Sequence, residues 1–402
     1  SKHDKLRDRG DVVSNMSSRG GQESSSAAVV MRDGVHGVTL RNVIVTGANR
    51  GLGYAIADRL LALGGYRVVL ACRSQEQGLA ALERLRAKQK LRNSQQHGCG
   101  TISTDFLASV HPLDVACPQS VEAFREGCVN GLLGGRVDIL FNNAGVCLPE
   151  GEEAEAQDNR TAAAGVLRET LAVNFFGALG VVEACLPALV AAAPPTTVEF
   201  EKNRKDTSME GNGMAMSKRS LRPPTVVWIS SGEGELCLLG RKWRELLAEA
   251  HSLEDVTSHM SGLMASATEH VKTTAASAGP HQQEGQGRLD QREEIAFGPT
   301  PAYSLSKAAV NAAVRTWAPS LLAPAATAES SETNAGYSVG AVRLVAVCPG
   351  DVLTRMTSKE EMARGDAVSP EKAALSVVDV ALSSIKEIPA GRFYRHGKEI
   401  EW

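Results

Sequence analysis

The sequence has little of what marks a nucleic-acid-binding, membrane or metal-binding protein. Its formal net charge is only −3 at pH 7, so there is no general basic field to attract nucleic acid or an anionic membrane. None of the eight cysteines forms a C-x-x-C pair, which makes disulfide and metal frameworks unexpected. No apolar run approaches the ~20 residues that cross a bilayer, and the first residues are polar, unlike a signal peptide. We therefore expect a cytoplasmic protein with no metal, no nucleic-acid partner and no membrane span.

The composition is that of a globular protein with a large core. Of the 402 residues, 43% are hydrophobic and 22% are charged. Residues 1–38 are rich in Ser, Arg, Gly and Asp and have no sustained apolar period, which predicts a flexible N-terminal extension. We expect residues 39–402 to form one domain with insertions, although the length alone would suggest two or three domains.

Short apolar segments alternate with helical patterns along this domain. The first apolar segment, 43–46, is followed by glycines and then by apolar residues at helical spacing from Ala55 to Leu63. Further strands are expected at 67–71, 110–113, 137–141, 225–230, 342–347 and near 393, and further helices at 79–87, 120–128, up to 190, at 303–322 and at 371–382. Continuous apolar strands separated by helices predict an α/β fold, a Rossmann-like, doubly wound parallel sheet of about seven strands flanked by helices.

Five segments interrupt this alternation. Four are polar or rich in small residues and predict surface insertions: 89–108, 150–160, 194–224 and 324–338. The fifth, 232–300, has apolar residues at helical spacing after Trp243, which predicts one or two amphipathic helices. Within it, Ser252-x-x-Asp255 has the pattern of an internal capping box.

A glycine-rich loop follows the first expected strand and opens the first expected helix. It reads Thr46-Gly47-Ala48-Asn49-Arg50-Gly51-Leu52-Gly53. Glycines at such a place let backbone amides approach a pyrophosphate, and the helix N-terminus adds partial positive charge. The loop therefore predicts a dinucleotide site, and a purely structural glycine turn is the alternative.

The end of the second expected strand indicates which dinucleotide would bind. An NAD site places an acidic residue there for the ribose 2'-hydroxyl, but this strand ends Leu70-Ala71-Cys72-Arg73. Arg73 and Arg50 could clamp the 2'-phosphate of NADPH through charge-assisted hydrogen bonds. The alternative is a pair of solvated surface arginines.

An expected helix begins with Tyr303-Ser304-Leu305-Ser306-Lys307. The spacing of four places Tyr303 and Lys307 on one face, one turn apart. A tyrosine hydroxyl with a pKa near ~10 is a poor proton shuttle at neutral pH, and we expect the nearby ammonium to lower that pKa by favouring phenolate. Because the pattern alone is common enough to arise by chance, other motifs must decide its meaning.

Four further motifs occur around this pair. They are Asn142-Asn143-Ala144-Gly145 after a strand, Asn174 within Ala172-Val173-Asn174-Phe175-Phe176-Gly177, Ile229-Ser230-Ser231-Gly232 closing a strand, and Cys348-Pro349-Gly350-Asp351-Val352-Leu353-Thr354. With the glycine loop and the Tyr-Lys pair, they stand in the order typical of classical short-chain dehydrogenases/reductases. From about residue 40 to 402, apart from the polar insertions, the chain resembles that family.

The resemblance implies roles for the matching residues. Tyr303 would donate a proton, Lys307 would lower the pKa of Tyr303 and bind the nicotinamide ribose, and Ser231, the second serine of its pair, would hold the substrate oxygen. Asn174 would complete a water-linked proton relay. The residues implied in binding NADPH or NADP+ are Gly47, Asn49, Arg50, Gly51, Leu52, Gly53, Arg73, Asp114, Val115, Asn143, Tyr303, Lys307, Pro349, Gly350, Val352 and Thr354. For Asp114, which would receive the adenine amino group, and for Thr354, a hydroxyl ligand, a turn acid and a cap are the alternatives.

The distance between two of these motifs indicates a branch of the family. Ser231 and Tyr303 are 72 positions apart, where most classical members have about a dozen residues. A helical insertion here resembles the monomeric carbonyl reductases and the plant alkaloid and menthone reductases, in which it covers the surface that other members use to form tetramers. The resemblance therefore implies a monomer. Asp351 and the segment after Gly145 depart from the carbonyl reductases at the expected substrate pocket. The resemblance therefore does not identify the substrate of this protein.

Together these patterns predict NADPH-dependent reduction of a small-molecule ketone, aldehyde or quinone to the alcohol, with Tyr303 as general acid and no metal. A dedicated pterin or terpenoid/alkaloid ketone reductase is an alternative within the same family. Another is a non-catalytic NADPH-binding regulatory protein, against which the complete set of Asn, Ser, Tyr and Lys argues.

Overall fold

The computed structural model describes residues 40–95, 107–148, 159–193, 222–276, 295–296, 300–322, 342–354, 356, 365 and 367–402. The predicted N-terminal extension, the insertion 324–338 and nearly all of 150–160 and 194–224 lie outside these residues, so those predictions stay predictions. The segment 89–108 differs from the expectation at its start, because its first residues, up to Gln95, continue a helix. The chain from Leu40 to Trp402 forms one compact unit.

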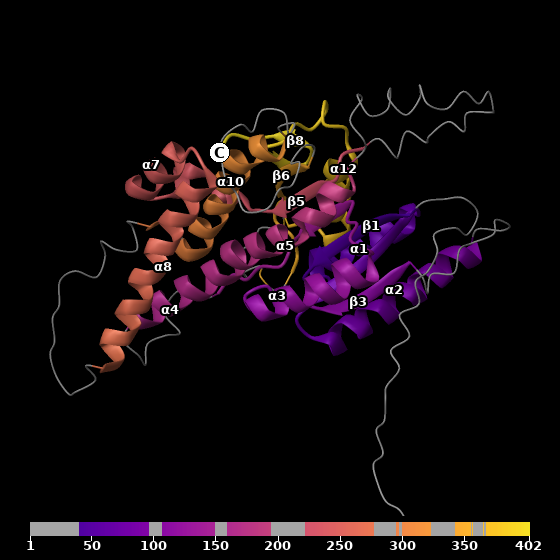
Figure 1. Ribbon diagram of the computed structural model, residues 1–402, viewed down its shortest axis with the longest axis horizontal. Coiled ribbons are helices and arrows are strands. Elements are labelled where there is room, and N and C mark those ends of the chain that lie inside the picture. Colours follow the sequence, from indigo (N-terminus) through magenta and orange to yellow (C-terminus); the bar gives the residue numbers. More distant parts are fainter. Residues whose placement is uncertain are drawn as a thin grey trace, which may run out of the picture. The chain divides into compact units, whose positions relative to one another are not determined.

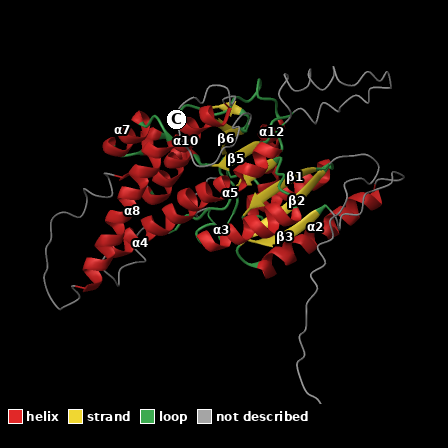
Figure 2. Cartoon of the chain, viewed as in Figure 1, coloured by secondary structure: helices red, strands yellow, loops and turns green. Residues whose placement is uncertain are grey.

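The described part of this unit contains one sheet of eight strands (Figure 2). In chain order these are β1 (Arg41–Thr46), β2 (Tyr66–Cys72), β3 (Ala108–Pro112), β4 (Ile139–Asn142), β5 (Thr225–Ile229), β6 (Arg343–Cys348), β7 (Phe393–Arg395) and β8 (Lys398–Glu399). Their spatial order is β3-β2-β1-β4-β5-β6-β7-β8, and all neighbours are parallel except β7 and β8. The predicted α/β, doubly wound parallel sheet is confirmed, with β8 as an antiparallel addition that the sequence pattern does not predict.

Each central strand sends alternate side chains to opposite faces of the sheet. In β1, Ile44 packs into one core with Val69 of β2, whereas Val43 and Val45 pack into the core on the other face. Because both faces are covered, these strands have no polar side, which explains their continuous apolar sequences.

Helices supply the rest of both cores. On one face lie α1 (Gly51–Leu63), α2 (Gln75–Gln95) and α12 (Pro370–Leu382). On the other lie α3 (Pro118–Phe124), α4 (Asn159–Leu171), α5 (Ala178–Ala191) and α10 (Pro301–Leu322). Two π-helical turns interrupt the second set: η2 (Arg125–Leu132) extends α3, and η4 (Ala172–Gly177) joins α4 to α5.

The helix that runs from α4 through η4 to α5 corrects one expectation. Its stretch Ala163–Ala191 is long and apolar enough to cross a membrane by length and composition, although no such run was expected. More than half of its most apolar window, 56%, is buried inside the protein, and Leu171, Val181 and Cys185 lie in the core beneath the sheet. A core helix of a folded domain meets the same criterion, so this stretch is weak evidence for a membrane span.

The described part of the insertion between β5 and α10 contains the α-helices α7 (Arg241–Glu249) and α8 (Leu253–Ala276), in agreement with the predicted one or two helices. The capping box is present but begins α8 rather than lying inside a helix. Ser252 Oγ accepts a hydrogen bond from the Asp255 N–H (3.0 Å), and Asp255 Oδ2 accepts one from the Ser252 N–H (2.9 Å). From this start α8 runs along α4 and α10 and packs on both (Figure 1).

A buried arginine joins the sheet to α12. Arg343 in β6 is only 1% exposed, and its guanidinium donates to the backbone carbonyls of Val380, Ala381, Ser383 and Ile388. The last carbonyls of a helix have no intrahelical donor, so the guanidinium caps α12. Burial lowers the pKa of Arg343 to about 10, which leaves it charged at neutral pH. This cap fixes α12 against the strand that leads to the Pro-Gly turn.

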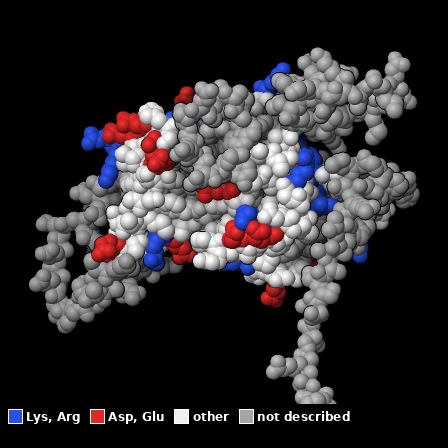
Figure 3. Space-filling view, viewed as in Figure 1, with Lys and Arg blue, Asp and Glu red and all other residues white. Residues whose placement is uncertain are grey.

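Acidic and basic side chains are mixed on the surface. On the face drawn in Figure 3, they are interspersed among uncharged side chains of the described residues. This distribution agrees with the small net charge of −3.

Candidate active site

Two of the predicted motifs meet where the strand order reverses. β1 pairs with β2 on one side and with β4 on the other, so the chain leaves β1 and β4 at neighbouring carboxyl ends. In open α/β sheets, ligands bind in the crevice at this point. The glycine loop follows β1, and the Asn-Asn-Ala-Gly turn follows β4.

The hydroxyl of Thr46 joins these two loops. Its Oγ1 accepts hydrogen bonds from the N–H groups of Asn143 (2.9 Å) and Ala144 (2.8 Å). In return, the side-chain amide of Asn143 donates to the Thr46 carbonyl (2.8 Å). Asn143 therefore holds the glycine loop in place, and the predicted contact with a ribose stays a prediction.

The glycines of the loop are required by its geometry. Gly47 and Gly51 have φ angles of +65° and +54°, in the left-handed region that favours glycine. A Cβ on Gly53 would lie 2.6 Å from both Asn143 Nδ2 and the Gly47 carbonyl oxygen. The Leu52 side chain is buried in the core, where it anchors the start of α1.

The N-terminus of α1 lies in the glycine loop. Arg50 is the N-cap residue in an extended conformation, and its side chain makes no capping hydrogen bond. Such a terminus binds anions through its free N–H groups and its partial positive charge. Asn49 is turned toward α2, where its amide donates to Gln77 Oε1 (2.8 Å).

Arg73 directly follows β2 and is exposed. Neither the Arg73 nor the Arg50 guanidinium has a hydrogen-bond or ionic partner among the residues that the structure describes. The described residues thus leave the predicted role of both arginines, an anion clamp, as a prediction.

Asp114 lies in the turn between β3 and α3. Its Oδ1 accepts a hydrogen bond from the N–H of Ala116 (3.1 Å), and its own N–H donates to Ser120 Oγ (2.9 Å). The structure thus gives Asp114 the turn role that was the alternative at the level of sequence. Its neighbour Val115 is buried, and the Val115 carbonyl oxygen lies 2.5 Å from where a Cβ on Gly177 would stand.

The Pro-Gly segment after β6 reaches the glycine loop. Gly350, after Pro349, has a φ of +79°, and Val352 forms an isolated bridge with Val368. Thr354 then lies against the loop, because a Cβ on Gly51 would be 3.5 Å from its Cγ2. The Thr354 hydroxyl also accepts the N–H of Met356 (3.1 Å), and its predicted role as a cofactor ligand stays a prediction.

The predicted serine, tyrosine and lysine converge at the end of β5. A hydrogen bond joins the side chains of Ser231 and Tyr303, whereas the buried Ser230 donates to the Lys307 carbonyl (3.4 Å). The Lys307 ammonium donates to the carbonyl of Ile229 (2.9 Å) and lies 5.4 Å from the centre of the Tyr303 ring. This arrangement favours Ser231 over Ser230, in agreement with the choice made from the sequence.

Asn174 completes the group from the π-helical turn η4. It is 1% exposed, and its amide pairs with both the N–H and the carbonyl of Val146 (2.8 Å each) and donates to Ser306 Oγ (3.0 Å). A Cβ on Gly145 would be 3.2 Å from Asn174 Oδ1 and 3.6 Å from Lys307 Nζ. The turn after β4 therefore touches both the glycine loop and these polar groups.

Burial has the largest influence on the titration of Tyr303 and Lys307. It raises the pKa of Tyr303 well above the ordinary tyrosine value and lowers the pKa of Lys307 to about 8. The net shift of the Tyr303 pKa is therefore upward, opposite to the lowering expected from the sequence, because burial disfavours phenolate. Smaller influences on the Tyr303 pKa come from Cys147 and Glu233, which raise it, from Ser231, which lowers it, and from Cys348, which raises it.

Three residues with clear roles in this geometry were not singled out from the sequence. Thr46 joins the loops, Ser306 links Asn174 to α10, and the Glu233 carboxylate lies beside the tyrosine. All three lie inside or beside a recognised motif. Their partners, however, come from segments far away in the sequence.

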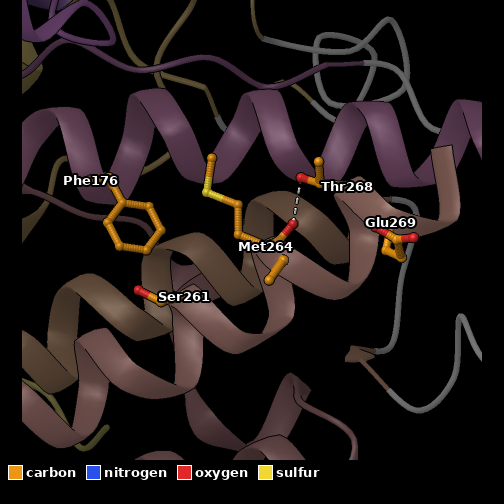
Figure 4. Close-up of a pocket in the computed structure, with 6 residues that line it drawn as sticks. Phe176, Ser261, Met264, Thr268 and Glu269 are labelled. Atoms are coloured by element: carbon orange, nitrogen blue, oxygen red, sulfur yellow. Dashed lines mark hydrogen bonds between the residues drawn. The ribbon is translucent and has the colours of Figure 1, made fainter. Parts of the chain in front are cut away.

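A shallow hollow of about 440 Å³ lies elsewhere, between η4 and α8. Figure 4 shows Phe176 and Met264 on the facing helices, with Ser261 and Thr268 also in its wall. None of the four predicted catalytic residues lines it. In the part of the chain that the structure describes, there is also no group of three His, Cys, Asp or Glu residues that could hold a metal ion.

Gly53→Ala tests the close approach of the two loops. The new Cβ would displace Asn143 or Gly47, so we expect a loss of roughly 1–3 kcal/mol in the free energy of unfolding, measured by urea denaturation. Gly262→Ala in α8, where nothing lies within 4 Å, is the control and should gain roughly 0.5–1 kcal/mol. Equal stabilities of the two variants would contradict the tight packing at Gly53.

Comparison with known proteins agrees with this geometry. Residues 41–195 match the family model described as short chain dehydrogenase. The chain is 27% identical over 370 residues to (+)-neomenthol dehydrogenase of Arabidopsis thaliana, covering 89% of this chain and 96% of that protein. It is 31% identical over 146 residues to carbonyl reductase (NADPH) 1 of Mus musculus, covering 36% and 44%.

A solved structure shares the fold. The menthone neomenthol reductase from Mentha piperita superimposes with a TM-score of 0.56 at 21% identity, covering 90% of this chain and 100% of that one. The motifs, the sheet and these similarities together assign the chain to the short-chain dehydrogenase/reductase family of oxidoreductases.

Proposed function

We propose that this protein is an NADPH-dependent reductase that converts a small-molecule ketone, aldehyde or quinone to the alcohol. The observation that carries the proposal is the convergence of four side chains from three segments: Asn174 in η4, Ser231 after β5, and Tyr303 and Lys307 in α10. The name of the mouse relative, which includes NADPH, supports this cofactor.

The residues present fit a dinucleotide. The N-terminus of α1, which the Arg50 side chain does not cap, would offer N–H groups to a pyrophosphate, and Gly47 and Gly51 leave room beside it. When bound, NADPH supplies a hydride to the carbonyl carbon. Tyr303 would protonate the oxyanion that develops on the substrate, and Ser231 would stabilise that oxyanion by a hydrogen bond.

A narrower function is the second candidate. The alignment with the Arabidopsis neomenthol dehydrogenase covers 96% of that protein, which favours a terpenoid ketone as substrate. One terpenoid ketone far ahead of simple quinones and aldehydes would support this reading, and a similar lead for a pterin or an alkaloid would select that class instead. Tight NADPH binding without any turnover would favour a regulatory protein.

The first test of the proposal is NADPH oxidation, followed at 340 nm with a panel of quinones, aldehydes and ketones. We expect turnover that falls by roughly 10²- to 10⁴-fold in Tyr303→Phe, because the general acid is lost. NADPH binding, measured by fluorescence, should stay within about twofold because the ring remains. Unchanged turnover in the variant would remove Tyr303 from the mechanism.

Arg73→Ala tests the preference for NADPH over NADH. Loss of one charge-assisted hydrogen bond to the 2'-phosphate should raise the KM for NADPH by roughly tenfold or more and leave the KM for NADH unchanged. The control is Arg241→Ala, at the exposed start of α7. An equal effect on both cofactors would show that Arg73 does not read the 2'-phosphate.

We also propose that the protein is a monomer in the cytoplasm. α8 packs on α4 and α10 and so covers helix surfaces that would otherwise be free for another subunit. Light scattering during gel filtration should give the mass of one chain, 42.5 kDa. A mass of two or four chains at micromolar concentration would contradict the monomer.

A further inference from the structure

Glu233 contacts both segments that carry the hydroxyl groups of the candidate active site. It belongs to the short 3-10 turn η6 (Gly232–Gly234), which directly follows Ser231. Its N–H donates to Ser231 Oγ (3.2 Å), so its backbone holds the serine. Its carboxylate oxygen Oε2 accepts hydrogen bonds from Thr300 Oγ1 (2.5 Å) and Ser304 Oγ (3.1 Å).

Both donors flank the tyrosine. Thr300 directly precedes α10, and Ser304 follows Tyr303 in its first turn. One carboxylate oxygen therefore connects the start of this helix with the segment that carries Ser231. The approach is close, because a Cβ on Gly234 would lie 2.8 Å from the backbone of Lys307.

The Glu233 carboxylate takes part in no ion pair of the described residues, whereas the nearby Glu235 pairs with Arg395 (3.0 Å). Its negative charge raises the pKa of both Tyr303 and Lys307. The other titratable groups that act on these two are Cys147 and Cys348, and each also raises both pKa values.

We propose that Glu233 is a positioning residue for proton transfer, whose carboxylate clamps the turn of α10 that carries Tyr303 against the segment that carries Ser231. This inference rests on the proposed reductase function. The clamp fixes the two hydroxyl groups on either side of the substrate oxygen, where small displacements are costly. Its charge also helps to keep the tyrosine and the lysine protonated at neutral pH.

Glu233→Gln separates charge from geometry. The glutamine oxygen can still accept from Thr300 and Ser304, but the negative charge is gone. The pKa values of Tyr303 and Lys307 should then fall, so the protonated forms that reduction needs are lost at lower pH. We expect the alkaline limb of the kcat profile for reduction to move down by roughly half a unit to one unit.

Glu233→Ala removes the clamp as well. We expect kcat to fall by roughly tenfold or more, while the KM for NADPH stays within about twofold, because Tyr303 is displaced and the cofactor loop is not. Glu235→Gln is the matched control, and the alkaline limb of its kcat profile should lie at the same pH as in the wild-type protein. If Glu233→Ala fails to fold, Ser304→Ala replaces it, since it removes one donor, keeps the charge and should lower kcat without moving the limb.

An unmoved alkaline limb in Glu233→Gln, or wild-type kcat in the variant that removes the clamp, would overturn the inference. A limb that moves as far in Glu235→Gln would overturn it too, because the effect would then not be specific to Glu233. Absence of turnover in the wild-type protein across the whole panel would instead overturn the proposed function, so the two failures are distinguishable.

Discussion

The Thr46 hydroxyl accepts two N–H groups from the turn after β4, and this pair of hydrogen bonds joins the two halves of the doubly wound sheet at the site. On one side it fixes the glycine loop and the N-terminus of α1. On the other it fixes Gly145, which lies beside both Asn174 and Lys307. A small buried hydroxyl thus links the residues suited to a pyrophosphate with those suited to proton transfer. Replacing it by an apolar group would remove the acceptor of the Ala144 N–H, whereas the Asn143 N–H would keep the Phe141 carbonyl (3.0 Å).

The catalytic candidates owe their positions to the small side chains around them. α10 is rich in buried alanines, such as Ala308 and Ala312, and it approaches β5 and η6 closely enough for Lys307 to reach the Ile229 carbonyl. The same closeness removes water from the ammonium, because Lys307 is only 5% exposed, and burial lowers its pKa. A buried charge with only neutral acceptors is costly. The stability of the packed helix must offset that cost, as is common at functional sites.

The fold and most of the site follow from the sequence, because strand and helix periods and motif order are local signals. The apolar segments, the glycine loop and the Tyr-Lys spacing are all of this kind. What could not be predicted depends on contacts across the chain. The raised pKa of Tyr303 and the bridge from Glu233 to Ser304, 71 positions along the chain, require knowledge of burial and of distant partners. The expectation that no apolar run approaches the length of a membrane span was also wrong, because only the structure shows that the apolar stretch through η4 is one continuous helix.

The π-helical turn η4 sets the rotation of α4 about the helix axis relative to α5. An α-helix advances by about 100° per residue, and a π-helical turn holds one residue more than an α-helical turn. α4 therefore presents its apolar stripe to α8, while α5 presents its own to the sheet, although the two form one rod. Asn174 lies at this change of phase. The segment 172–177 should thus tolerate replacement of a side chain far better than deletion of a single residue, which would turn α4 away from α8 and take the amide of Asn174 out of the site.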